Sequence, residues 1–487
     1  MASLYIFSQS LDKEGSEKLD FPTGLTTKEL KRRGRSIPLN CVDKCLLALD
    51  SINEPMLIHA ILNIEGEIDH VRLNQAILSA QKAYPIMRTI LRSKGFKAFR
   101  EIQEDLGEGV LTVKDMIELQ DANYDRYLSE WMNQPLDIRK VFPVRVLLVK
   151  KNKVESSLVF TFHHSATDGL RAVIFVRKVI ESYGNEVSED SEPSEDIRIS
   201  RKGDELLEFA RSQRSRVEHY HMKMISSLFH RFVIAAFPPP TRVFHDKSGH
   251  SKELYLCFTT VRPRELEQIE SKSRSAGVEL NDILLAACYG VVEKWNSIHG
   301  KFSKKIRIMA PVNISPKGFR YVVSNQASWI SPSTSPEDRA DPAKLLRKVR
   351  ADTIYATQNR TAFSLVYFFY FCSRFPLVVM RGMCRFLMIT RTYVDTILIT
   401  NIGLIWPKIG SEEPAVTSIG SSNIVNVTGS APVVTPMGLS ISACIYNKNL
   451  ALALTYRPAL FSEEKAKMFL DLYVEEIINY QVNPGGS

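Results

Sequence analysis

Two adjacent histidines, followed by an aspartate and a glycine, form the part of the sequence best suited to chemistry. They lie in the segment His163-His164-Ser165-Ala166-Thr167-Asp168-Gly169. An apolar run over residues 158–162 predicts a buried strand before this segment, and apolar residues at helical spacing over 170–183 predict a helix after it. A histidine held at the end of a strand is a natural general base, because its ordinary pKa of about 6.5 lies near working pH.

The same residues allow three other interpretations. His164 and Asp168 have the i, i+4 spacing of a metal-ligand pair, but no third ligand is evident in the sequence. Two histidines that are hydrogen-bonded inside a core, without a catalytic role, are a second possibility. Ser165 lacks the G-x-S-x-G context of a serine nucleophile. The pattern favours the general base over these alternatives.

The pattern H-H-x-x-x-D-G resembles the active-site motif of the thioester-dependent acyltransferase superfamily. That superfamily includes chloramphenicol acetyltransferase, the condensation domains of nonribosomal peptide synthetases, the wax ester synthases and the polyketide-associated acyltransferases. Weaker similarities follow in the order that the superfamily shows. They are an N-D-x-x-L-A segment from Asn281, a P-V-N segment that ends at Asn313, Thr400-Asn401-Ile402-Gly403 in place of S-N-x-G, and a hairpin over residues 439–456.

The resemblance implies an α/β fold in which two chloramphenicol acetyltransferase-like domains face each other across a central tunnel. We expect residues 1–215 to form the N-terminal domain, which carries the motif, and residues 216–487 to form the C-terminal domain. An acidic loop over 184–205 and the prolines at 238–240 flank this boundary. The residue patterns predict helices over 39–49, 73–84 and 206–236, and strands over 57–64, 144–149, 158–162, 254–259 and 306–311.

The resemblance also implies a role for each residue of the motif. His164 takes the proton from the acceptor while the acceptor attacks the thioester carbonyl and the thiol leaves, without an acyl-enzyme. His163 is structural, because adjacent side chains on an extended segment point in opposite directions. Asp168 is structural and pairs with an arginine, and Gly169 leaves room for backbone or substrate.

The sequence departs from the family at the arginine that relatives carry after P-V-N. This chain has Ile314-Ser315-Pro316-Lys317 there, so Asp168 needs another partner. Lys317, Arg320 and Arg35 are the candidates that the sequence offers.

Two further segments are candidates for the site. Thr400 and Asn401 are candidate substrate-binding residues, although Asn-Ile-Gly also favours a simple turn. Asn281 and Asp282 are better explained as a helix cap.

The resulting functional hypothesis is transfer of an acyl group from a thioester to a hydroxyl, which forms an ester. The thioester is acyl-CoA or an acyl group on a phosphopantetheinyl carrier protein, and we expect no bound cofactor and no metal. The alternative is a free-standing condensation enzyme that forms an amide from substrates bound to a carrier protein. A second alternative, from a different class, is a non-catalytic lipid-binding or scaffold protein with the same fold.

Charge and composition agree with a large globular protein. Of 487 residues, 44% are hydrophobic, and 63 Lys and Arg against 54 Asp and Glu give a net charge of +9. This excess suits an anionic co-substrate, an acidic carrier protein or a membrane surface, and it is too dispersed to indicate nucleic acid. Seven scattered cysteines and the absence of a targeting signal predict a cytoplasmic protein with reduced thiols, and we expect a monomer.

The most apolar region, residues 363–399, is interrupted by arginines and is too short between them to span a membrane. It suits a helix pair packed on the core, the wall of an apolar tunnel, or a segment that makes peripheral contact with a membrane.

Overall fold

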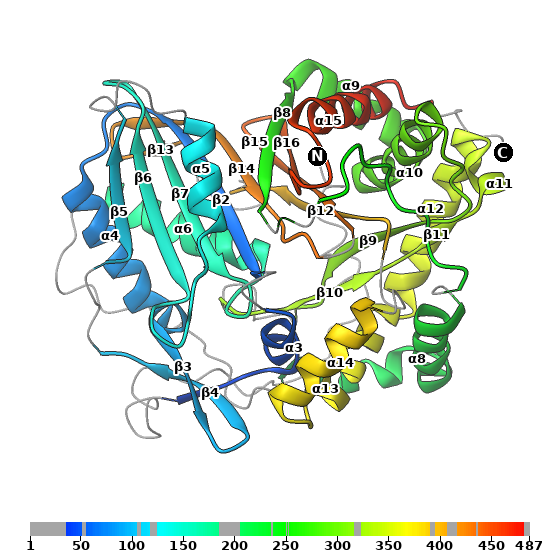
Figure 1. Cartoon of the computed structure of the whole chain (residues 1–487), viewed down its shortest axis with the longest axis horizontal. Helices are drawn as coiled ribbons and strands as arrows, with labels where there is room; N and C mark the ends of the chain where they lie inside the picture. The colour runs from blue at the N-terminus through cyan, green and yellow to red at the C-terminus, as the bar shows by residue number, and fades with distance from the viewer. Residues whose placement is uncertain are drawn as a thin grey trace.

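The computed structural model describes residues 36–50, 55–104, 109–116, 124–184, 205–234, 237–249, 251, 253–315, 323–389, 395–406, 416–434 and 437–481. Within these residues the chain forms two α/β lobes that lie side by side (Figure 1).

The first lobe is built on a six-stranded sheet of order β13-β14-β2-β7-β6-β5. Its strands are β2 (Leu57–Glu65), β5 (Leu111–Asp115), β6 (Val144–Lys150), β7 (Glu155–His163), β13 (Ser418–Ile419) and β14 (Ser422–Ser430). Helices α4 (His70–Ala83) and α6 (Gly169–Gly184) cover one face, and α5 (Tyr124–Asn133) covers the other (Figure 1). A small sheet of β1 (Ser36–Pro38), β4 (Lys97–Ile102) and β3 (Thr89–Lys94) adjoins this lobe.

Burial on both faces explains why β7 reads as a continuous apolar run. Leu158, Phe160 and Phe162 face the helices α4 and α6, whereas Val159 packs beneath α5. Because successive side chains alternate between the faces, a strand covered on both sides needs apolar residues at almost every position.

The second lobe holds a seven-stranded sheet of order β10-β9-β12-β15-β16-β8, with β11 paired to β9. Its strands are β8 (Tyr255–Val261), β9 (Ile306–Asn313), β10 (Ala327–Ile330), β11 (Ser333–Thr334), β12 (Ile397–Leu404), β15 (Leu439–Tyr446) and β16 (Asn449–Tyr456). Its helices are α7 (Glu205–Ser212), α8 (Tyr220–Phe229), α9 (Pro263–Ser275), α10 (Leu280–Ile298), α11 (Pro336–Arg339), α12 (Pro342–Gln358), α13 (Ser364–Cys372), α14 (Leu377–Ile389) and α15 (Glu463–Ile478). Helix α3 (Cys41–Leu49) comes from the N-terminal part of the chain but packs against α13 and α14.

The two lobes exchange segments of chain, so the expected division into residues 1–215 and 216–487 does not separate the two sheets. Strand β14 comes late in the sequence and pairs with β2 in the first lobe. Gly429 permits this pairing, because a Cβ atom there would lie 2.6 Å from the carbonyl oxygen of His59. In the other direction, α7 precedes residue 215 but contributes Leu206 and Ala210 to the core of the second lobe.

Most of the expected elements are present with small shifts at their ends. The strand expected over 158–162 is β7, and the final hairpin is β15 and β16. The single helix expected over 206–236 is instead α7 and α8 with short turns between and after them, and residues 235–236 lie outside the described residues. Residues 185–204 of the expected acidic loop also lie outside them.

The helices of the described chain do not include one that is by itself long and apolar enough to cross a membrane. Only α9 and α10 taken together pass that test, and they meet at an angle of 102°.

Candidate active site

His164 lies in the turn between β7 and α6, where the two lobes meet. Its backbone N–H donates to the carbonyl of Met56 at 2.7 Å, and its Nδ1 lies 2.9 Å from the carbonyl oxygen of Thr167. A carbonyl can only accept, so Nδ1 carries the proton and Nε2 keeps a free lone pair. The half-buried ring is therefore held in the tautomer that a general base requires.

His163 points into the protein, where its ring contacts Ser165 and Asp50. Its Nδ1 accepts from the backbone N–H of Ser165 at 3.2 Å and lies 2.8 Å from the hydroxyl of Ser165. Its Nε2 lies 3.4 Å from a carboxylate oxygen of Asp50. The ring is 1% exposed. These contacts keep the strand end and the turn rigid.

Asp168 caps the first turn of α6. One carboxylate oxygen accepts from the backbone N–H of Arg171 at 3.0 Å, which is the geometry of a helix N-cap. The other accepts from the backbone N–H of Gln326 at 2.8 Å and lies 3.4 Å from the guanidinium of Arg171.

Among the described residues Arg171 is a charged partner of Asp168, one that the sequence prediction did not include. The candidates Lys317, Arg320 and Arg35 all lie outside the described residues. The partner is three residues away on the first turn of α6, where i, i+3 side chains are neighbours. That spacing after the motif aspartate is the signal that sequence reasoning missed.

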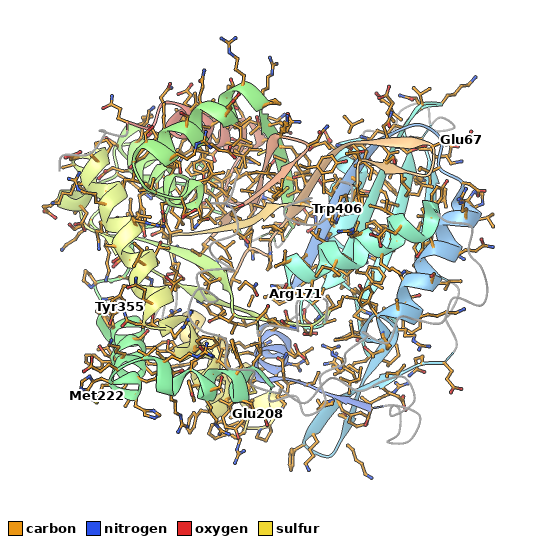
Figure 2. All side chains as sticks on the ribbon, turned by 180° about the vertical axis from the view of Figure 1, so that it is seen from behind. Glu67, Arg171, Glu208, Met222, Tyr355 and Trp406 are labelled. Carbon is orange, nitrogen blue, oxygen red and sulfur yellow. The ribbon has the colours of Figure 1, made fainter. Side chains whose placement is uncertain are left out.

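The guanidinium of Arg171 also joins the lobes. It is 1% exposed and lies at the centre of the molecule (Figure 2). It donates to the Oδ1 of Asn313 at 3.0 Å, to the Oε1 of Gln326 at 3.1 Å and to the hydroxyl of Ser315. All three belong to the second lobe. In this contact α6 supplies the charge and Ser315 supplies an acceptor.

Gly169 begins α6 and faces β12 of the second lobe. A Cβ atom at Gly169 would meet the side chain of Ile402 at 3.5 Å, which is an ordinary contact. The pairing of β12 with β15 is irregular after Asn401, so the alternation of side chains does not fix where Thr400 points relative to Ile402. The role of Thr400 in substrate binding stays a prediction.

Asn401 makes its described hydrogen bonds within the second lobe, and its role in substrate binding stays a prediction. Its side-chain oxygen accepts from the N–H of Gly403 at 2.9 Å, and its amide lies 3.4 Å from Asn281 on α10. The pairing of β12 with β15 shifts register between Asn401 and Leu404. The segment thus forms an irregularity within a strand and not the simple turn that its composition favours.

Three residues behind the turn were not found from the sequence. The Asn325 amide donates to the carbonyl of His164 at 2.8 Å and to Asp43 on α3 at 2.9 Å. Arg100 on β4 donates to the carbonyl and the hydroxyl of Ser165. Burial raises the pKa of Asp43 to about 6, against the opposing charge of Arg100. These contacts fix the backbone that carries the base.

Comparison with known proteins places this arrangement in a family. The sequence profile of the condensation domain matches residues 48–299, which include the whole histidine motif. The chain belongs to the condensation-domain family. A curated relative of this condensation-domain protein is surfactin synthase subunit 1 of Bacillus subtilis (strain 168), with 25% identity over 143 residues. The match covers 29% of this chain but only 4% of that much longer protein.

Solved structures show the same two-lobed fold, in which each lobe resembles chloramphenicol acetyltransferase. The first condensation domain of the calcium-dependent antibiotic synthetase has a TM-score of 0.66 at 12% identity, covering 93% of this chain and 98% of that one. SgcC5 from Streptomyces globisporus has a TM-score of 0.60 at 18% identity, covering 91% and 98%. The starter condensation domain of rhizomide synthetase RzmA has a TM-score of 0.62 at 13% identity, covering 92% and 94%.

Activity of this condensation-domain protein should fall at acid pH with a midpoint below 6.5. Burial lowers the pKa of His164 below its ordinary value of 6.5, against the opposing effects of the Thr167 carbonyl and Asp168. With the neutral ring as the expected base, kcat/KM should rise as pH increases through this lowered pKa and be level near neutral pH. A pH profile of kcat/KM checks this, and a midpoint above 7 would contradict it. Buried Asp43 also titrates near this pH, so an Asp43→Asn variant is the control. Its pH profile of kcat/KM should show the same fall at acid pH as the wild type.

Replacing Asn325 with alanine should reduce kcat by about 10- to 100-fold, because the carbonyl of His164 loses its donor and the ring moves from its working position. KM should change little. Asn133→Ala is the matched control, since Asn133 makes similar bonds to Ser129 and Leu254 away from the site. Steady-state kinetics on both variants check this. An equal loss of kcat in the two variants would show that general destabilisation, and not the position of His164, is responsible.

Proposed function

We propose that the chain transfers an acyl group from a thioester to a hydroxyl acceptor, with His164 as the general base. The observation that carries this proposal is the bond from the Nδ1 of His164 to the Thr167 carbonyl, which leaves Nε2 as the basic atom. The lowered pKa of His164 keeps that atom unprotonated at neutral pH.

The reaction proceeds by direct attack. Nε2 takes the proton of the acceptor hydroxyl while the oxygen forms a bond to the thioester carbonyl carbon. The tetrahedral intermediate then breaks its carbon–sulfur bond, and the imidazolium returns the proton to the departing thiolate. The products are an ester and a free thiol. Base catalysis of this kind contributes about 10²–10⁴-fold to the rate.

The environment of Ser165 supports direct attack over an acyl-enzyme. The residue is fully buried, and its hydroxyl is held between the Nδ1 of His163 and the guanidinium of Arg100. A nucleophile must reach the carbonyl of the substrate, and this hydroxyl has no path to it.

The relatives indicate the classes of donor and acceptor to be tested. The RzmA starter condensation domain was solved with C8-CoA and Leu-SNAC, which are a CoA compound and an aminoacyl thioester. SgcC5 was solved with a naphthyl ethanediol, which carries two hydroxyls. For this chain we therefore propose an acyl-CoA or a carrier-bound acyl group as donor and an alcohol as acceptor. Amide formation with an amine acceptor is the second candidate, since condensation domains form amide bonds.

The deciding experiment measures thiol release from acyl-CoAs of increasing chain length, with alcohols or amines present. Acceptor-dependent release with alcohols, and an ester among the products, would support the proposal. Release with amines alone would replace it with amide formation. No thiol release with any acyl-CoA, but turnover with an acyl-loaded carrier protein, would keep acyl transfer as the reaction and would identify the carrier protein as the donor. No thiol release with either donor would favour the non-catalytic alternative, a lipid-binding or scaffold protein.

A further inference from the structure

The helix pair α13–α14 has one face packed on the core and an opposite face that is apolar and exposed. On α14, Met380 is 2% exposed, whereas Val378, Val379 and Phe386 are 71%, 43% and 65% exposed. Spacings of seven and eight residues place these three on one side of the helix. Phe371 on α13 is 63% exposed, and its ring contacts Phe375 with centroids 5.8 Å apart. An exposed cluster of this kind marks an interaction surface.

A second apolar stripe lies on the neighbouring helix. Met222, Ile225 and Phe229 on α8 are 66%, 62% and 55% exposed and follow helical spacing. Helix α8 packs against α13, and the three helices lie together at the lower edge of the second lobe in Figure 1. Met222 lies at the outer rim of the molecule in Figure 2. The apolar surface thus extends from α14 toward α8 along one edge of the protein.

The two segments that form this surface carry no acidic residue. The sequence has no Asp or Glu between Asp352 and Asp395, nor between Glu218 and Asp246, although the whole chain has 54 acidic residues. Arg374 and Arg385 are exposed on the α13–α14 pair. Burial and the like charges of Arg139 and Arg385 lower the pKa of Arg381 on α14, against the opposing charge of Asp50.

Glu218 is exposed just before α8 and lies beside His219, whereas the acids that neighbouring elements contribute are engaged elsewhere. Asp50 lies 3.4 Å from His163, and the half-buried Glu208 on α7 has an interaction of its own. Exposed phenylalanines combined with an excess of arginine fit a surface that is apolar beneath and anionic at its boundary, which describes a bilayer with acidic headgroups.

We propose that the exposed face of α13–α14, extended by α8, docks this protein on anionic membranes. The phenylalanine and valine side chains enter the boundary between headgroups and acyl chains, and the arginines contact the acidic headgroups. This is a peripheral contact in the plane of the membrane, and it is independent of the chemistry at His164.

The test is flotation of the purified full chain with phosphatidylcholine vesicles, with or without about 30% phosphatidylserine, a content that gives the surface a negative potential. We expect the protein to float with the anionic vesicles and to be released by high salt. Phe371→Ser combined with Val378→Ser should weaken partitioning at least about tenfold, because the anchoring apolar area is lost. Arg385→Gln should weaken it about fivefold.

Matched controls separate the docking face from surface changes in general. Ile298→Ser with Phe302→Ser removes two exposed apolar side chains elsewhere, 54% and 74% exposed, and Arg264→Gln removes an exposed charge on α9. These variants should float as the wild type does. A His164→Ala variant should also float, so failure of the proposed reaction would leave this result intact.

Several outcomes, each sufficient by itself, would overturn the proposal. They are no flotation with anionic vesicles, equal binding to neutral ones, an unchanged partition for the Phe371 and Val378 variant, and a lipid-free dimer that this variant converts to a monomer. Binding of an acidic carrier protein in place of vesicles would also overturn it, since the surface would then be a protein interface.

Discussion

Replacing His164 with alanine is expected to lower kcat by about 10²–10⁴-fold while the protein stays folded. The loss follows because Nε2 of His164 is the only atom of the motif that the structure leaves as a free base, whereas His163 and Asp168 are engaged in structural bonds. Folding should survive because the ring makes one hydrogen bond, to a carbonyl of its own turn. Thiol release and thermal unfolding, measured on the same preparation, check both parts.

His163→Ala is the informative control for this prediction. His163 is buried and accepts from the backbone of Ser165, so its loss leaves a buried N–H without a partner and costs about 1–3 kcal/mol of unfolding free energy. The two variants should therefore differ in which property they lose. His164→Ala should lose rate at an unchanged free energy of unfolding, whereas His163→Ala should lose free energy of unfolding. A His164→Ala protein with the wild-type rate would remove the general base from the mechanism.

Replacing Arg171 with methionine is expected to destabilise the protein by about 3–5 kcal/mol, the largest loss of stability that we predict for a single substitution. The side chain is 1% exposed and its removal leaves the buried carboxylate of Asp168 without its cation. It also removes donors to Asn313, Gln326 and Ser315 across the junction between the lobes. The free energy of unfolding in urea measures the effect.

A second buried ion pair supplies the control for Arg171. Arg307 and Asp395 are 2% and 3% exposed, are 2.5 Å apart and lie at the opposite end of β9 from Asn313, within the second lobe. Arg307→Met should destabilise to a similar degree, but only Arg171→Met should also reduce activity under conditions where both proteins are folded. If Arg171→Met combined with Asp168→Asn is no more stable than Arg171→Met alone, then an unpaired Asp168 does not explain the loss.

The strand, turn and helix around His164 could be predicted from the sequence because the signals are local. The apolar run before the motif and the helical spacing after it reflect burial of β7 on both faces and of α6 on one. The order of the weaker motifs then extended the prediction to the fold of the second lobe.

The residues that hydrogen-bond to the backbone of the His164 turn could not be predicted, because they are distant from it in sequence. Asn325 is 161 residues from His164, and Arg100 is 65 residues from Ser165. Nothing in the composition of either neighbourhood marks them as partners. Arg171 was missed for a different reason. It is a local partner, but the family pattern directed attention to the segment after Asn313.

The strand that the second half of the chain supplies to the first lobe also sets the order in which the protein can assemble during synthesis. Ser422, at the start of β14, bonds to a carbonyl 355 residues earlier in the chain. Until that segment leaves the ribosome, β2 is paired only with β7, and its other edge exposes a row of free backbone N–H and C=O groups. The emerging lobe is therefore open to aggregation for most of the translation time, and its completion coincides with completion of the second lobe. We therefore expect a chaperone that covers this edge during translation to raise the yield of folded protein.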